Sequence, residues 1–178
     1  MTTFTPTTPA ETLAAVSWAV SEEAPLEIVG HGSKRGLGRS VQAANTLDLS
    51  RLSGVTLYEP EELVMSAQAG TPLAEIEALL AANNQELAFE PMDYAHLHGA
   101  APGRGTIGGV FSCNLSGPRR LKAGAARDHI LGVEIVTGRG DIVKSGGRVV
   151  KNVTGYDLSK LMCGAYGTLG ALTQVTFK

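Results

Sequence analysis

Two glycine-rich stretches carry the residue types that could bind an anionic ligand. In the first, residues 30–38 (GHGSKRGLG), Ser33, Lys34 and Arg35 stand among glycines. Glycine allows the backbone to approach a ligand closely and to direct successive N–H groups toward it. A hydroxyl and two cations can add charge-assisted hydrogen bonds, each contributing about 1.5–3 kcal/mol. This loop is therefore suited to hold a diphosphate.

The second stretch, residues 103–128, alternates glycines, small hydroxyls and basic residues (GRGTIGGVFSCNLSGPRRLKAGAARD). Its Gly108-Gly109 and Ser116-Gly117 pairs could also direct N–H groups at phosphate or at polar ring edges. We expect it to bind a ligand and not to form a packed core element. On the residues alone, two glycine-rich surface turns are an equally good interpretation, because glycine marks turns far more often than ligand sites.

The first loop does not match a known nucleotide loop. Gly30, Gly32 and Gly36 give GxGxxxG where the Rossmann fingerprint has GxGxxG, and the sequence has no Gly-Lys-Ser/Thr of a P-loop. His96 and His98 have a spacing found in metal sites, but no third ligand lies nearby in the sequence. We therefore expect no metal.

Composition limits the remaining classes of protein. The chain has 178 residues, 43% hydrophobic and 18% charged, which is typical of one globular domain or two small lobes. A net charge of −2 favours neither nucleic acid nor an anionic membrane as partner. Cys113 and Cys163 have no CxxC spacing, so a disulfide or zinc site is not expected and a reducing compartment fits. With no leader and no apolar run of about 18 residues, we expect no membrane span and a cytoplasmic location.

Short strands and capped helices are predicted to position the two stretches. Thr8 caps a helix that runs to Ser21, and a strand at 26–29 leads directly into the first glycine loop. A second helix begins at Thr71-Pro72. Further predicted elements are strands at 46–50, 55–59, 63–69 and 87–89, a hairpin of 130–137 with 142–145, a short helix to 162, and a last strand at 171–178.

Three motifs, in this order, resemble a known family. They are GHGSKRGLG, TIGGVFSCNLSGPRRLKAGAARDHILGVEIVTGRGDIVKSGGRVVKNVTGYDLSKL and GAYGTLGALTQVTFK. Together they are similar to the FAD-binding domain of the vanillyl-alcohol-oxidase or p-cresol-methylhydroxylase (PCMH) type, and within it to FAD-binding subunits of glycolate oxidase. The resemblance implies an α+β fold in which two lobes, approximately residues 1–70 and 71–178, hold FAD between them. Members of the family continue into a cap region, which we expect to be absent here.

The resemblance also implies which residues contact FAD. Residues of the first loop correspond to the pyrophosphate loop, namely Gly30, His31, Gly32, Ser33 and Lys34. Residues of the second stretch correspond to segments along the ribityl and flavin end, namely Thr106, Gly108, Gly109, Asn114, Ser116 and Gly117. Weaker candidates near the same groove are Pro91, Arg119, Lys151, Asn152, Gly155 and Tyr156.

Covalent attachment of the flavin is not expected. Members with covalent flavin often carry histidine just after the glycines of the loop, and here that position resembles Ser33. His31 is a candidate anchor, although an ordinary loop histidine is the favoured interpretation. No catalytic base is identified, since none of the histidines has a recognisable partner in the sequence.

The implied function is that of a flavoprotein subunit in the oxidation of 2-hydroxy acids such as glycolate. FAD would accept a hydride equivalent and pass electrons to a second flavin subunit and an iron–sulphur subunit, which could attach the chain peripherally to the inner membrane. A non-catalytic FAD-binding or assembly module is the main alternative. The related cell-wall enolpyruvyl reductase is a third, for which the SGPRR and KNVTGYDL stretches are poor matches.

Overall fold

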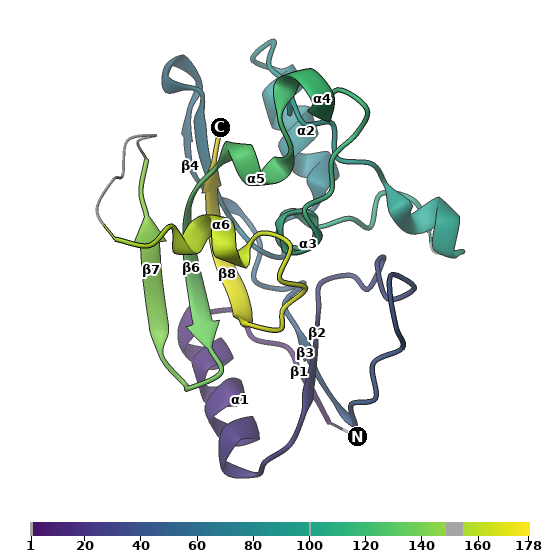
Figure 1. Cartoon of the computed structure of the whole chain (residues 1–178), viewed down its shortest axis with the longest axis vertical. Coiled ribbons are helices and arrows are strands. Elements are labelled where there is room, and N and C mark those ends of the chain that lie inside the picture. Colours follow the sequence, from purple (N-terminus) through teal and green to yellow (C-terminus); the bar gives the residue numbers. More distant parts are fainter. Residues whose placement is uncertain (1, 100, 149–154) are drawn as a thin grey trace.

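The computed structural model describes residues 2–99, 101–148 and 155–178, in which the strands form two sheets (Figure 1). A parallel three-stranded sheet has the order β1-β3-β2, and an antiparallel five-stranded sheet has the order β4-β5-β8-β6-β7. The strands are β1 (Thr2–Phe4), β2 (Leu26–Val29), β3 (Asn45–Asp48), β4 (Val55–Glu59), β5 (Val64–Gln68), β6 (Ile130–Thr137), β7 (Ile142–Gly146) and β8 (Gly170–Phe177).

The helices lie around these sheets. They are α1 (Pro9–Ser21), η1 (Pro60–Glu62), α2 (Leu73–Ala81), η2 (Tyr94–His98), α3 (Ile107–Cys113), α4 (Arg120–Ala123), α5 (Ala126–His129) and α6 (Leu158–Met162). The two predicted N-terminal helices, the β6–β7 hairpin and the last strand are confirmed within a residue or two of their predicted bounds. No helix in the described part of the chain is long and apolar enough to cross a membrane.

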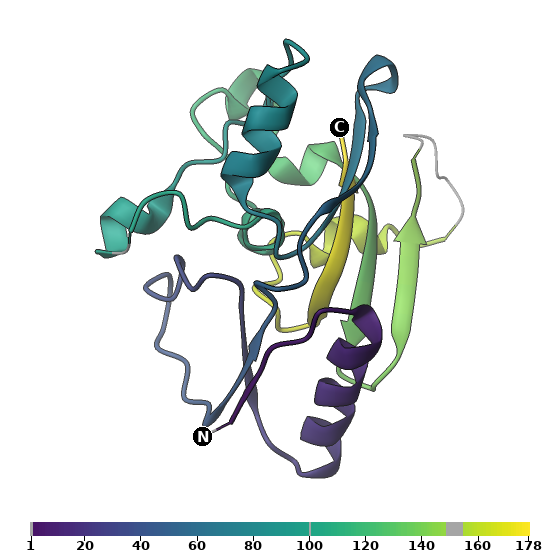
Figure 2. The same cartoon turned by 180° about the vertical axis from the view of Figure 1, so that it is seen from behind.

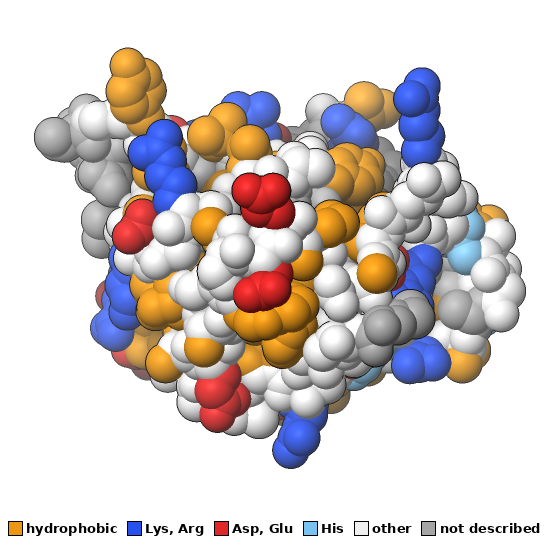
Figure 3. All heavy atoms as spheres, turned by 90° about the horizontal axis from the view of Figure 1, so that it is seen from below, with side chains coloured by type: hydrophobic (Ala, Val, Ile, Leu, Met, Phe, Trp, Pro, Cys, Tyr) orange, Lys and Arg blue, Asp and Glu red, His pale blue; other side chains and the backbone are white. Residues whose placement is uncertain are grey.

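Helix α1 joins the two sheets at one end of the molecule (Figures 1 and 2). The Oγ1 of Thr8 accepts a hydrogen bond from the backbone N–H of Glu11 at 3.1 Å, which is the predicted N-cap. Val16 of α1 packs with Leu47 of the small sheet and Val136 of the large sheet in one buried cluster. Seen from this end, hydrophobic side chains lie between separate acidic ones (Figure 3).

The main core lies between the large sheet and helices α2, α3 and α5. Phe111 of α3 packs between Phe89 and Phe177 with its ring tilted against both, the ring centroids lying 5.7 and 5.4 Å apart. The expectation that residues 103–128 do not form a packed core element is thus wrong. Ile107 and Phe111 are fully buried because they share one face of α3 at helical spacing.

One further prediction differs from the structure. Residues 87–89 form no strand. Leu87 and Phe89 lie in an irregular segment with a turn, and their side chains are buried in the core, but no described strand pairs with this segment. Strand β4 pairs with β5, and β5 pairs with β8, so the chain passes from the small to the large sheet between Asp48 and Val55. The approximate division of the chain into two lobes near residue 70 stays a prediction.

Candidate functional site

A cavity of about 610 Å³ lies where the loop after β2 faces helix α3 and the loop before β8. In Figure 1 the loop after β2 lies beneath α3. Eight of the predicted site residues line this cavity: Gly30, His31, Gly32, Ser33, Lys34, Thr106, Gly108 and Gly109. The tertiary structure therefore brings the first loop and the start of the second stretch to one place.

Four successive backbone N–H groups of the first loop have no hydrogen-bond acceptor within the described part of the chain. They belong to residues 31–34. The loop is instead closed farther along, where the N–H groups of Arg35 and Leu37 donate to the carbonyls of Gly32 (3.3 Å) and Lys34 (3.0 Å). Successive unpaired N–H groups in a glycine-rich loop form a concave anion-binding surface.

The N-terminal backbone N–H groups of helix α3 are hydrogen-bonded to other groups of the protein. The N–H groups of Ile107 and Gly108 donate to the carbonyls of Thr71 (3.0 Å) and Ala69 (2.9 Å). The N–H of Gly109 donates to the side chain of Thr106 at 3.3 Å. This end of α3 forms a wall of the cavity without offering these three N–H groups to a ligand.

Glycines allow the two segments to approach closely. A Cβ atom on Gly30 would lie 2.7 Å from Oγ1 of Thr106, and one on Gly108 would lie 2.7 Å from the carbonyl oxygen of Ala69. A Cβ atom on Gly109 would lie 3.3 Å from the ammonium nitrogen of Lys34. A side chain at any of these positions would push the walls of the cavity apart.

Lys34 brings a cation without a carboxylate partner into the cavity. Its Nζ lies 3.3 Å from Oγ of Ser33, and the described residues place no carboxylate within the distance of an ion pair. Burial lowers the pKa of Lys34, while the nearby Cys113 and Asp93 oppose the shift. Desolvation also raises the pKa of Cys113, which lines the same cavity. A partly desolvated, unpaired ammonium group favours an anionic ligand.

The cavity has a second wall that the site prediction did not include. Tyr166, Gly167 and Thr168 line it, from a loop in which Tyr166 and Gly167 have φ angles of 54° and 77°. The N–H of Tyr166 donates to the carbonyl of Ser112 at 2.9 Å, which ties this loop to α3. The signal in GAYGTLG is its three glycines, each separated from the next by two residues. All three have positive φ angles, which glycine adopts more readily than other residues.

Comparison with known proteins identifies the family. Residues 2–146 match the model of the FAD binding domain. The chain belongs to this family. It is 46% identical, over 93% of its length, to the glycolate oxidase subunit GlcE of Escherichia coli (strain K12), of which it covers 45%. It is 33% identical, over 94% of its length, to the D-2-hydroxyglutarate dehydrogenase of Xanthomonas citri pv. viticola, of which it covers 34%.

A solved structure of alkyldihydroxyacetonephosphate synthase has the same fold as this FAD binding domain. The two superpose with a TM-score of 0.74 at 21% identity, over 99% of this chain and 31% of the synthase. The predicted α+β fold and the predicted resemblance to a glycolate oxidase FAD-binding subunit are confirmed. The chain spans less than half the length of these curated relatives.

FAD is the cofactor of this family, and the residues of the cavity fit it. The unpaired N–H groups of residues 31–34 and the ammonium of Lys34 are suited to a diphosphate. Nδ1 of His31 is buried and has no hydrogen-bond partner among the described residues. A buried polar atom usually has such a partner, which a bound cofactor would supply here. Leu26 and Ile28 of β2 add an apolar wall, which suits a planar ring system.

Asn114, Ser116 and Gly117 of the FAD binding domain do not line the cavity. The side-chain oxygens of Asn114 and Ser116 accept hydrogen bonds from the backbone N–H groups of Arg127 (3.0 Å) and Ala126 (2.9 Å). The N–H of Gly117 donates to a core carbonyl at 2.8 Å. These residues hold the chain that leaves α3, which gives them a structural role.

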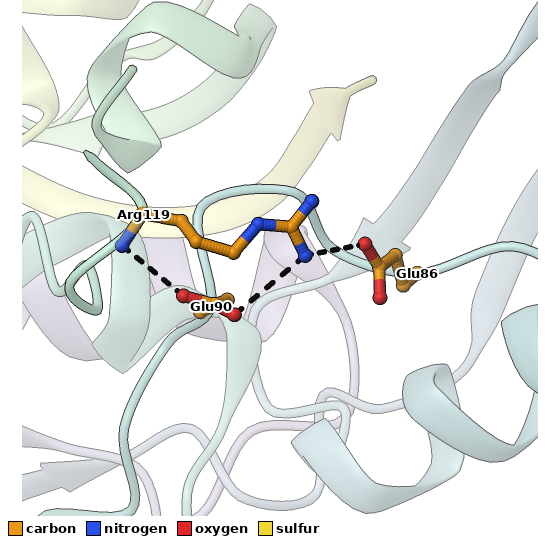
Figure 4. Close-up of polar contacts among 3 residues, drawn as sticks. All are labelled: Glu86, Glu90 and Arg119. Carbon is orange, nitrogen blue, oxygen red and sulfur yellow. Dashed lines mark hydrogen bonds and ion pairs between the residues drawn. The ribbon is translucent and has the colours of Figure 1, made fainter. Parts of the chain in front are cut away.

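Arg119 is also engaged away from the cavity (Figure 4). Its Nη1 lies 2.6 Å from Oε1 of Glu86 and 3.6 Å from Oε1 of Glu90. Its backbone N–H donates to Oε2 of Glu90 at 3.2 Å. Pro91, Gly155 and Tyr156 lie outside the cavity lining as well. Lys151 and Asn152 lie outside the described residues.

Proposed function

We propose that this chain is the FAD-binding part of a 2-hydroxy-acid oxidase or dehydrogenase complex and that it binds FAD without a covalent link. The observation that carries the proposal is the set of N–H groups at residues 31–34 that find no acceptor among the described residues, beside an ammonium with no carboxylate partner there, in a cavity of about 610 Å³. Similarity to a glycolate oxidase subunit supports the substrate class.

Each part of the first loop has a role in this proposal. The N–H groups of residues 31–34 and the ammonium of Lys34 hold the diphosphate, while Gly30 allows the loop to approach Thr106. The apolar side chains of β2 exclude water from one side of the cavity. When bound, FAD supplies the chemistry, accepting a hydride equivalent from a 2-hydroxy acid and releasing electrons.

Further subunits complete the proposed complex. A segment of 73 residues is 47% identical to the glycolate oxidase subunit GlcD of Bacillus subtilis (strain 168), of which it covers 16%. Both relatives are named as subunits of glycolate oxidase, which indicates an oxidase of several subunits. We assign a second flavin subunit and an iron–sulphur subunit as partners, because electrons that leave FAD need an acceptor. The proposed location is the cytoplasm, with peripheral attachment to the inner membrane through these partners.

The first test concerns the cofactor. The purified chain is saturated with FAD, its flavin absorption band is recorded, and the protein is precipitated with acid. The proposal expects a stoichiometric flavin band and release of all the flavin into the supernatant. Flavin retained in the pellet would contradict the non-covalent link and would direct attention to His31, and an absence of binding would contradict the proposed function as a whole.

The second test concerns the substrate. Glycolate and D-lactate are added to the FAD-loaded chain, alone and in the presence of the proposed partner subunits, with an artificial dye as electron acceptor. The proposal expects bleaching of the flavin band and dye reduction in the complex, at a rate of about 1 s⁻¹ or more. A flavin band that neither substrate changes in the complex would favour the non-catalytic assembly module. For the isolated chain, we expect turnover well below this rate.

A further inference from the structure

An ion pair at the rim of the cavity links the first loop to the strand from which it starts. Nε of Arg35 donates to Oε1 of Glu27 at 2.9 Å, and Nη2 donates to Oε2 at 2.6 Å. Glu27 lies on β2, and both residues line the cavity. Two parallel hydrogen bonds between a guanidinium and a carboxylate fix the geometry of both groups more firmly than a single contact does.

This pair closes the segment that carries the unpaired donors. The Glu27 side chain is only 21% exposed, so the carboxylate is partly shielded from solvent. At the other end, the Arg35 N–H donates to the carbonyl of Gly32, and the Arg35 side chain passes 3.6 Å from the position of a Cβ atom on Gly32. Residues 31–34, which find no backbone partner among the described residues, lie between the strand and this anchor.

A loop with few hydrogen bonds of its own loses conformational freedom when it binds a ligand. Fixing the backbone of a residue costs conformational entropy and so opposes binding, and a contact that fixes the loop beforehand removes part of that cost. Glu27 is a carboxylate at the rim of a site that binds a diphosphate. By charge alone, Glu27 would weaken the binding of FAD, and removal of its charge would strengthen it.

We infer that Arg35 and Glu27 are positioning residues, whose bidentate pair holds the N–H groups of residues 31–34 in the conformation that receives the diphosphate. The inference rests on the proposed binding of FAD. It predicts that loss of Glu27 weakens FAD binding, which is opposite to the result expected from its charge. If Arg35 contacted the diphosphate directly, removal of Glu27 would release Arg35 to the ligand and would strengthen binding.

The test is a fluorescence titration of FAD against folded variants of the chain at fixed pH and ionic strength. Arg35→Met and Glu27→Gln are each expected to raise the Kd about tenfold. The double variant Glu27→Arg with Arg35→Glu, which restores the pair in reverse, is expected to return the Kd to within about threefold of the original. Arg51→Met is the control. Arg51 is exposed, lies outside the cavity lining and has no ion pair among the described residues, so its variant is expected to change the Kd less than threefold.

Association kinetics separate positioning from a general loss of stability. A loop that is less often in the binding conformation lowers the association rate, with little change in the dissociation rate. Thermal unfolding of the FAD-free variants is expected to leave the midpoint nearly unchanged. A Glu27→Gln variant that binds FAD as tightly as the original chain, or more tightly, would overturn the inference, as would a reversed pair that fails to restore binding. Absence of FAD binding by the original chain would instead overturn the proposed function.

Discussion

The two glycine-rich stretches, residues 30–38 and 103–128, treat their backbone donors in opposite ways. In residues 31–34 the N–H groups find no acceptor among the described residues. In residues 107–109 three successive N–H groups donate to Thr71, Ala69 and Thr106. Both segments are rich in glycine, yet one presents donors to a cavity and the other uses glycine to pack a helix closely. Glycine content alone therefore does not distinguish a loop suited to a ligand from a packing contact. The difference lies in whether the backbone N–H groups already have acceptors within the protein.

An arginine secures each of these glycine-rich regions. Arg35 pairs with one carboxylate, Glu27, beside the cavity. Arg119 pairs with Glu86 and Glu90 outside the cavity lining, where it holds the turn that follows α3 (Figure 4). The comparison predicts that changes in the first region affect FAD binding more than folding, and that changes in the second region affect folding more than FAD binding.

The largest effect is expected from Gly108→Ala. Its new Cβ atom would lie 2.7 Å from both the Cβ and the carbonyl oxygen of Ala69, so backbone must move. Overpacking of a buried contact destabilises by about 1–3 kcal/mol, and we expect a loss near 3 kcal/mol in the free energy of unfolding. Urea unfolding measures it. Equal stability of this variant and the original chain would show that α3 does not depend on the close approach.

Gly32→Val is expected to change FAD affinity more than stability. Gly32 has a φ of +70° but space around its Cβ position, so the fold should lose only about 1–2 kcal/mol from backbone strain. FAD affinity should fall about hundredfold, equivalent to the loss of two charge-assisted hydrogen bonds. Gly103→Val is the control, because Gly103 has a similar φ of +74° and an open Cβ position but does not line the cavity. FAD titration of both folded variants tests this. Similar FAD affinities of the Gly32→Val and Gly103→Val variants would contradict a specific role of the first loop in FAD binding.

Lys34→Met is expected to weaken FAD binding about tenfold, since it removes one charge-assisted contact. Without FAD, the variant should be more stable than the original chain at pH 7. Burial lowers the pKa of Lys34 in the folded protein, so the charged form disfavours folding until the pH approaches the ordinary lysine value of 10.5. The difference in unfolding free energy should therefore shrink as the pH rises from 7 to 10.5. Urea unfolding at several pH values tests this, and a difference that grows with pH would contradict it.

The smallest effect is expected from Arg119→Met. Its guanidinium is exposed and lies outside the cavity lining, so FAD affinity should not change. Exposed ion pairs contribute little to stability, and the thermal midpoint should fall by no more than about 2 °C. Calorimetry and FAD titration measure the two quantities. A fall in FAD affinity of tenfold or more would show that Arg119 belongs to the site, as the family resemblance implies.

Local signals in the sequence were sufficient for most of the elements. The Thr8 cap predicts the start of α1, and the turn at residues 138–141 predicts the β6–β7 hairpin. The sequence also predicts the strand that leads into residues 30–38 and the suitability of this loop for an anion, because both follow from residues that are adjacent in the sequence. Residues 87–89 were predicted wrongly as a strand, since their apolar pattern indicates burial but not whether a partner strand is present.

By itself, the sequence determined the family and the α+β class, and it predicts the first loop as the place where an anion binds. Only the tertiary structure decided which N–H groups remain available to a ligand. The acceptor for the N–H of Ile107 is the carbonyl of Thr71, and the acceptor for the N–H of Gly117 is the carbonyl of Phe89. These partners are far apart in the sequence and meet only when α2, α3 and the large sheet pack together. A backbone donor is free or occupied according to what the fold brings beside it, which residue types and spacing do not specify.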